Sequence, residues 1–285
     1  NNTATLADFA SYLAAVSAVN RVSVLWNGQN IVSMTGRDAA ALMYFRHGVV
    51  PPQNNHDDVD DDRRCVTLFV LLGRRAYDPQ SCFPATRRGE LTLELDVDVA
   101  DTGYDDLQLT VETVELLGAE PKEFERTIQT VQTFGATGIN DVDLPLGNLY
   151  RGMLLFGTTS FAGAAPVPSW GRVSLLASGT ATGVSSSDFE SLHAASSVLG
   201  RQPPGMDAHT HRVDASSSSA SEETAGGPIE VGSSGFQNYA YLDLDPWRDD
   251  RHSIDSSEHS RLHLEADAET ADLVRVVGVE RVLVT

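Results

Sequence analysis

The sequence predicts an all-β protein made of two tandem β-barrels, each carrying one short helix. Short segments in which apolar and polar residues alternate recur along the chain, separated by turn residues. The phrase RVSVLWNG at residues 21–28 also returns as RVSLLASG at 172–179, about 150 residues later. Alternation favours strands, and a repeat of this length indicates duplicated domains rather than a solenoid.

The repeat extends over five landmarks in the same order. A helix-like run ending at glycine follows each copy of the phrase, and three more pairs then match: AYDPQ with LDPWR, LTLELDVD with LHLEADAE, and LTVETVELL with VVGVERVLV. Because the order is kept, the sequence indicates an internal duplication. The offset between the copies grows towards the C-terminus, which predicts an insertion between Gly200 and Phe236 in the second copy.

The first copy begins with a predicted β-hairpin. Arg21–Trp26 is rich in β-branched and apolar residues, Asn27-Gly28 is a strong two-residue turn signal, and we expect Gln29–Met34 to form the return strand. We expect further strands at Cys65–Leu72, covered on both faces, at Leu91–Val99 with one face in a core, and at Leu107–Leu117.

The second copy is predicted to contain the same kinds of element. The expected strands are Leu149–Phe156, Arg172–Ala177, Phe236–Leu244, Arg261–Ala266 and Leu273–Val284.

Each copy has one predicted helix after its first hairpin. Thr35 and Asp38 form a capping-box signal before Ala39–Phe45, which stops at Gly48. Ser185-Ser-Ser-Asp188 precedes the second helix, Phe189–Leu199, which stops at Gly200.

These elements predict two jelly rolls, because many short strands of this kind close their edges as a Greek key or jelly roll. The expected organisation is an N-terminal segment at 1–20, a first jelly roll at 21–120, an inter-barrel connection at 121–147, and a second jelly roll at 148–285. Within the second jelly roll we expect a surface loop at 201–235, which is rich in Ser, Gly and Pro.

The charge balance limits the partners. The chain of 285 residues has 40 acidic and 20 basic residues, a net charge of −20. Such a charge repels phosphate, so we expect no direct binding to nucleic acid. Only Lys122 is a lysine, and the other basic residues are arginine. Adaptation of the protein to concentrated salt and a GC-rich coding sequence are two explanations of this scarcity of lysine. No apolar run approaches the ~20 residues that span a bilayer.

Several motifs resemble catalytic or metal-binding patterns, but we predict no functional site at any of them. PPGMDAHTHRV at 203–213 looks like a phrase of metal-dependent amidohydrolases, with His209 and His211 as metal ligands. That family needs further ligands downstream and an α/β barrel, so we interpret the phrase as a polar loop. We expect no catalytic residue, no metal and no cofactor.

Other acidic and histidine groups have the same interpretation. The run Asp57, Asp58, Asp60, Asp61 and Asp62 lacks the glycine and spacing of a calcium loop. The group Asp243, Asp245, Asp249 and Asp250 surrounds Trp247, and His259 and His263 lie in a strand pattern rather than on a helix. Cys65 and Cys82 are expected to be reduced, buried thiols.

The sequence resembles the double jelly-roll major capsid proteins of tailless, membrane-containing icosahedral viruses. The phrases that carry the resemblance are VNRVSVLWNGQNIVSMTGRDAAALMYFRHG, LLGRRAYDPQSCFPATRRGELTLELDVD, VDLPLGNLYRGMLLF and YLDLDPWRDDRHSID. The resemblance implies a structural protein of the virion shell. Three chains would form a pseudo-hexagonal homotrimer that tiles the shell beside neighbouring capsomers, minor capsid or penton proteins, and an internal membrane.

Three other functions stay open at this point. A tandem jelly roll also serves as a carbohydrate-binding module or as a viral spike or surface-layer protein. The third alternative is a metal-dependent hydrolase that uses His209 and His211.

Overall fold

The computed structural model describes residues 16–48, 53–56, 63–98, 107–158, 169–178, 180–181, 186–199, 236 and 238–284. The chain divides into two compact units. The first comprises Asn1–Ala40, Pro51–Ile128 and Gly278–Thr285, and the second comprises Ala41–Val50 and Gln129–Val277.

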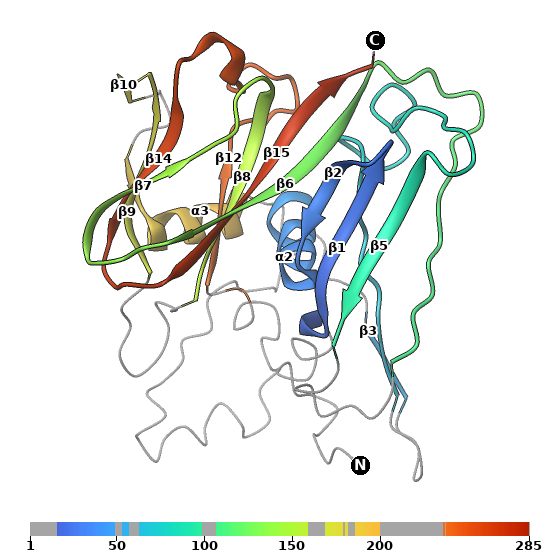
Figure 1. Cartoon of the computed structure of the whole chain (residues 1–285), viewed down its shortest axis with the longest axis horizontal. Helices are drawn as coiled ribbons and strands as arrows, with labels where there is room; N and C mark the ends of the chain where they lie inside the picture. The colour runs from blue at the N-terminus through green and yellow to red at the C-terminus, as the bar shows by residue number, and fades with distance from the viewer. Residues whose placement is uncertain are drawn as a thin grey trace. The chain divides into compact units, whose positions relative to one another are not determined.

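The first unit contains a sheet with a β-hairpin near its edge. This sheet includes β1 (Val19–Trp26), β2 (Gln29–Met34) and β5 (Leu91–Val97). A separate two-stranded ribbon consists of β3 (Gln53–His56) and β4 (Arg63–Val66). β1 lies between β2 and β5 and runs antiparallel to both, as Figure 1 shows. β2 pairs in parallel with β6 (Glu123–Thr133), which neighbours β15 (Leu273–Leu283).

The predicted hairpin and first helix are confirmed. Asn27 and Gly28 both have positive φ angles, 50° and 79°, as a two-residue turn between twisted strands requires. α2 (Gly36–His47) starts with the expected capping box. The Asp38 amide donates to Thr35 Oγ1 at 3.1 Å, and the Thr35 amide donates to Asp38 Oδ2 at 3.3 Å. Gly48, with φ 63°, ends the helix.

The second unit contains two sheets. In one, the strand order is β12-β8-β15, and in the other it is β10-β9-β14-β7. Its strands are β7 (Gly138–Asp143), β8 (Leu149–Gly157), β9 (Trp170–Ala177), β10 (Thr180–Ala181), β11 (Ser187–Asp188), β12 (Tyr239–Asp243), β13 (Ile254–Asp255) and β14 (Leu262–Ala268). α3 (Phe189–Leu199) follows β11, and a short 3-10 turn, η2 (Ser256–Glu258), follows β13. The helix after the first hairpin of this copy is therefore confirmed.

One core joins both sheets of the second unit. Trp170 is fully buried, meets Phe134 edge-to-face at 5.2 Å and stacks on Phe189 at 6.5 Å. Its indole Nε1 donates to the backbone oxygen of Phe156 at 3.0 Å, which satisfies the buried donor. Apolar residues of β8 and β12 pack with residues of β9 and β14 in the same core. This arrangement is a β-sandwich.

Three expectations for the first copy are wrong. Cys65–Leu72 is a strand only to Val66, because β4 pairs with a ribbon strand of four residues. The alternation at Leu91–Val99 does form β5, but its apolar face is not in a core, since Leu91, Leu93 and Val97 are 37–40% exposed. Leu107–Leu117 forms no strand and pairs with no other strand in the part of the chain that the structure describes.

The segment expected to connect the barrels is largely strand. Residues 121–147 contain β6 and β7, which pair within the sheets. Two long strands, β6 and β15, have residues in both compact units, so the units are not consecutive along the chain. Gly200 and residues 201–235 lie outside the described residues.

Candidate functional site

Most of the motifs that suggested metal chemistry lie outside the residues that the structure describes. His209, His211 and the acidic run at 57–62 lie outside the described residues. Among the residues that are described, no three His, Cys, Asp or Glu side chains are grouped so that they could hold a metal ion. Within the same residues, no helix has the length and hydrophobicity that a membrane span needs.

The acidic group around Trp247 holds a buried arginine. Arg151, on β8, is fully buried, and its Nε and Nη2 donate to the two carboxylate oxygens of Asp250 at 2.8 and 3.1 Å. Asp245 is also buried, with Oδ2 4.0 Å from Arg151 Nε. The guanidinium therefore compensates one fully buried carboxylate and one that is 20% exposed.

The same carboxylates fix the backbone of the loop after β12. Asp245 Oδ1 accepts hydrogen bonds from the amides of Asp249 and Asp250, both at 2.9 Å. Arg248 and Asp250 take positive φ angles of 58° and 63°, which this network holds in place. The result is an ordered loop on which Trp247 is 75% exposed.

Asp243 borders this loop and titrates differently from an ordinary carboxyl. Burial raises its pKa, although the Asp245 amide donates to Asp243 Oδ1 at 2.9 Å and Arg248 and Arg46 oppose the rise. The residue as a whole keeps an exposed surface, so solvent screens the effect.

The histidine pair and the cysteines have no shared site. His263 is buried on β14, with Nε2 3.9 Å from Asp141 Oδ2, while His259 lies after η2 and outside the strand. Cys82 is a free thiol and is only half-buried, so the expectation that it is buried is wrong. Burial and the charge of Asp78 raise the pKa of the Cys82 thiol. The side chain of Cys65 lies outside the described residues.

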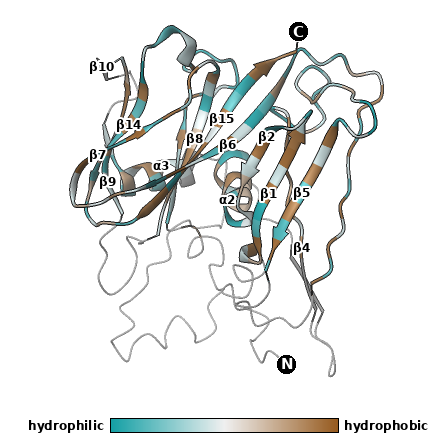
Figure 2. Ribbon diagram, viewed as in Figure 1, coloured by the Kyte–Doolittle hydropathy of each residue, from teal (hydrophilic) through white to brown (hydrophobic). Residues whose placement is uncertain are grey.

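The first unit exposes a group of apolar side chains, which we call the apolar strip. Leu91, Leu93 and Val97 come from β5, and Figure 2 shows hydrophobic and hydrophilic residues alternating along this strand. The segment 107–117 adds four side chains that are 46–95% exposed: Leu109, Val111, Val114 and Leu117. β5 also ends the strand order of its sheet in the described structure, so one edge of its backbone has no strand beside it. An apolar face next to an open edge is typical of a surface that another molecule covers.

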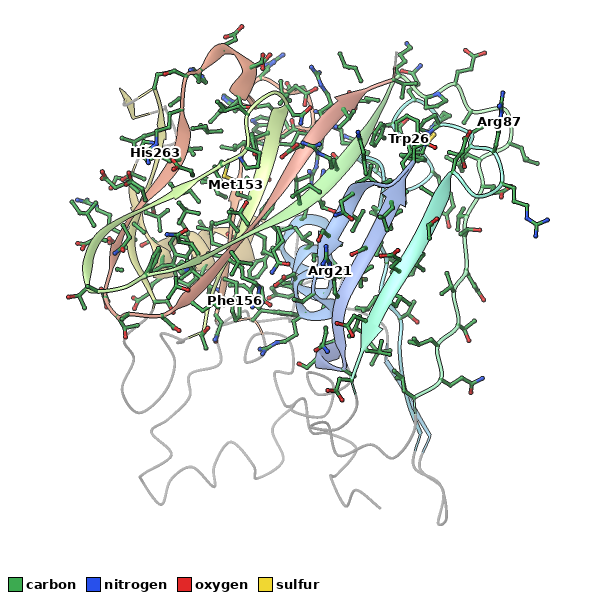
Figure 3. All side chains as sticks on the ribbon, in the orientation of Figure 1. Arg21, Trp26, Arg87, Met153, Phe156 and His263 are labelled. Carbon is green, nitrogen blue, oxygen red and sulfur yellow. The ribbon has the colours of Figure 1, made fainter. Side chains whose placement is uncertain are left out.

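The first unit also contains a segment rich in arginine, residues 73–90. Arg75, Arg87 and Arg88 are exposed, and Arg74 is partly exposed. Figure 3 shows the Arg87 side chain projecting away from the ribbon. In a chain with a net charge of −20, four arginines against Asp78 and Glu90 make this segment locally basic.

Comparisons with known proteins identify the fold. No protein-family model matches the chain, and no curated protein matches it. Solved structures do match. The STIV MCP has a TM-score of 0.59 at 13% identity, over 94% of this chain and 80% of that one. The PBCV-1 virus capsid has a TM-score of 0.56 at 9% identity, over 94% and 81% of the two chains. The major capsid protein P2 from bacteriophage PM2 has a TM-score of 0.51 at 12% identity, over 95% and 84%.

The chain has the fold of viral major capsid proteins. The resemblance seen in the sequence is confirmed at the level of the fold, since nearly the whole chain aligns with each of these structures. Identities of 9–13% are too low to carry residue roles across.

Sequence reasoning missed two features of the structure. The buried pairing of Arg151 with aspartates could not be predicted, because a single arginine inside a strand pattern does not indicate which residues it contacts in the fold. The basic segment did leave a signal in the two Arg-Arg pairs, Arg74-Arg75 and Arg87-Arg88, within a lysine-poor acidic chain.

Proposed function

We propose that this chain is a major capsid protein that builds the shell of an icosahedral virus. The observation that carries the proposal is the fold, which matches capsid proteins over at least 94% of the chain. The exposed apolar strip supports it, because a protein that works as an array of copies needs surfaces that become covered on assembly.

The proposed assembly is built from trimers. Three copies form a pseudo-hexagonal trimer, and trimers tile the shell around an internal membrane, together with minor capsid or penton proteins. The chain is made in the host cytoplasm and works in the virion, without direct contact to nucleic acid. The division of the chain into jelly rolls at 21–120 and 148–285, with a surface loop at 201–235, stays a prediction.

Light scattering on the purified full-length chain tests the proposal. We expect a homotrimer that grows into larger arrays as concentration rises. Leu93→Asp in the apolar strip should weaken association at least about tenfold, because a buried leucine side chain contributes ~1.5–3 kcal/mol. Ile139→Asp is the matched control, since Ile139 is 73% exposed on β7 and lies outside the strip.

The alternative functions predict different results for the same purified protein. A monomer at every concentration that binds sugars would favour a carbohydrate-binding module, and isolated trimers that never form arrays would favour a spike. Stoichiometric zinc together with a hydrolase activity that His209→Ala abolishes would favour the metal-dependent enzyme.

A further inference from the structure

Two ordered loops of this chain carry opposite charge and complementary side chains. The arginine loop, residues 73–90, belongs to the first unit, and the tryptophan loop, residues 243–258, belongs to the second. Each contains an Asp-Pro turn, at Asp78-Pro79 and at Asp245-Pro246, and these turns are partners in the sequence repeat. Each also exposes an aromatic side chain: Tyr77 is 73% exposed and Trp247 is 75% exposed.

The arginine loop is held in place although it contains no strand. Its Phe83 packs edge-to-face on Trp26 at 5.4 Å and on Phe124 at 4.8 Å. The Arg74 amide donates to Ser81 Oγ at 2.9 Å. A side chain at Gly73 would meet the Ser81 backbone oxygen at 1.8 Å, so only glycine allows this close approach. The arginines therefore project from an ordered base.

The second half of this loop is equally fixed. The Arg87 amide donates to Glu90 Oε2 at 2.8 Å, and the Glu90 amide donates to the Arg87 backbone oxygen at 3.1 Å. The Asn27 amide, in the turn after β1, donates to the Glu90 backbone oxygen at 2.9 Å. Arg87 and Arg88 are thus presented on a closed turn next to the sheet.

The tryptophan loop is fixed by the buried Arg151, as described above, and by a second arginine. Arg248 Nη2 donates to the backbone oxygen of Arg46 at 2.7 Å, which ties the loop to the end of α2. Preorganised loops of this kind bind with little loss of conformational entropy. An ordered loop that leaves a tryptophan in water therefore has the properties of a binding anchor, since tryptophan and arginine dominate binding energy at interfaces.

The charges of the two loops match. The tryptophan loop has six carboxylates against its own two arginines and the buried Arg151, which leaves it acidic, and the arginine loop has four arginines against two carboxylates. Copies that each carry a net charge of −20 repel one another, so a contact between copies is favoured where one of them presents local positive charge. Arginine also binds the face of an aromatic ring, as Arg275 already does over Phe156 at 3.6 Å in this chain.

We propose that the arginine loop of one copy binds the tryptophan loop of a second copy, with Trp247 inserted among the arginines. The proposal rests on the proposed function and names one of its contacts. A second copy is the occupant because every copy presents both complementary loops.

Two single variants of the full-length chain test the contact, each with a matched control. Trp247→Ala should weaken association about thirtyfold or more, as loss of an interface anchor does, whereas Ile139→Ala removes an equally exposed side chain and should not. Arg87→Glu should weaken association similarly, whereas Arg21→Glu makes the same charge change at an exposed site on β1 and should not. Circular dichroism melts verify folding, and Trp247→Gln and Arg88→Glu replace any variant that fails to fold.

Mixing the two variants gives the decisive result. A Trp247→Ala copy keeps an intact arginine loop, and an Arg87→Glu copy keeps an intact tryptophan loop, so the mixture should form a 1:1 complex through one contact. Sedimentation of each variant alone and of the mixture measures this. The contact is refuted if the mixture associates no better than the separate variants.

The remaining outcomes separate this contact from the proposed function. If the wild type assembles and both variants assemble like their controls, the contact is wrong and the capsid function stands. If only one of the two variants loses association, the pairing of these loops is also wrong. If the wild type never associates, both proposals fail.

Discussion

Replacing Arg151 by methionine should destabilise the second unit strongly. The change removes a fully buried guanidinium and its two hydrogen bonds to Asp250, at 2.8 and 3.1 Å. It also removes the positive charge that lies 4.0 Å from Oδ2 of the buried Asp245. Breaking a buried ion pair by removing one partner costs about 3–5 kcal/mol. For a unit of this size, that loss lowers the melting temperature by roughly 6–20 °C.

Urea unfolding followed by tryptophan fluorescence measures the loss. Arg261→Met is the matched control, because Arg261 also contacts two aspartates, Asp141 and Asp143, but is 46% exposed. The control should shift the midpoint far less, since water screens an exposed pair. Adding Asp245→Asn and Asp250→Asn to Arg151→Met should restore much of the stability, because the unpaired charges are then gone. A loss below about 1 kcal/mol for Arg151→Met would refute the reasoning that its charge is needed inside the protein.

Two single contacts and two shifted pKa values give four further tests. Trp170→Ala should lower the free energy of unfolding in urea by about 3–5 kcal/mol, because it leaves a cavity in the core and removes the hydrogen bond to the Phe156 backbone oxygen. Thr35→Ala should cost about 1 kcal/mol in the same assay, through loss of the α2 cap, and an unchanged midpoint would contradict the capping role. Since burial raises the pKa of Asp243, the stability that its protonation supplies is present at acid pH and is lost as pH rises through that pKa. Asp243→Asn should therefore raise the thermal midpoint at pH 7 and flatten its pH dependence. Because the pKa of Cys82 is raised, its thiol should react slowly with disulfide reagents at pH 8 in a Cys65→Ser background, and Asp78→Asn should speed the reaction.

Local signals in the sequence predicted the elements whose contacts are local. The Asn27-Gly28 turn fixes two positive φ angles, so the hairpin follows from two residues. The α2 start follows from Thr35 and Asp38, three residues apart, which satisfy each other's amides. The strand at Arg172–Ala177 was also predicted, because its alternation faces a core within one unit, and β9 extends it back to Trp170.

Elements whose partners are distant could not be predicted in this way. Leu107–Leu117 alternates like a strand, but alternation states only that one face suits an apolar neighbour, and it does not supply a strand to pair with. The expectation that β5 packs on a core failed for the same reason, since its apolar face is half-exposed in a single copy. Arg151 meets residues about 100 positions away, and no local pattern encodes that distance.

Two of the three first-copy segments that contradicted the sequence expectations carry the exposed apolar side chains. The apolar strip consists of β5 and of the segment that failed to form a strand. Covering by another copy would explain why both patterns are apolar on one face. The acidic composition adds a condition, because copies with a net charge of −20 associate more readily when salt screens their repulsion. Adaptation to concentrated salt stays a prediction.

Electron microscopy of the concentrated full-length protein, in low salt and in molar salt, tests the capsid function most directly. We expect trimeric particles of hexagonal outline that order into sheets or closed shells, with assembly favoured by salt. Monomers that stay dispersed at every concentration and in both salts would contradict the account.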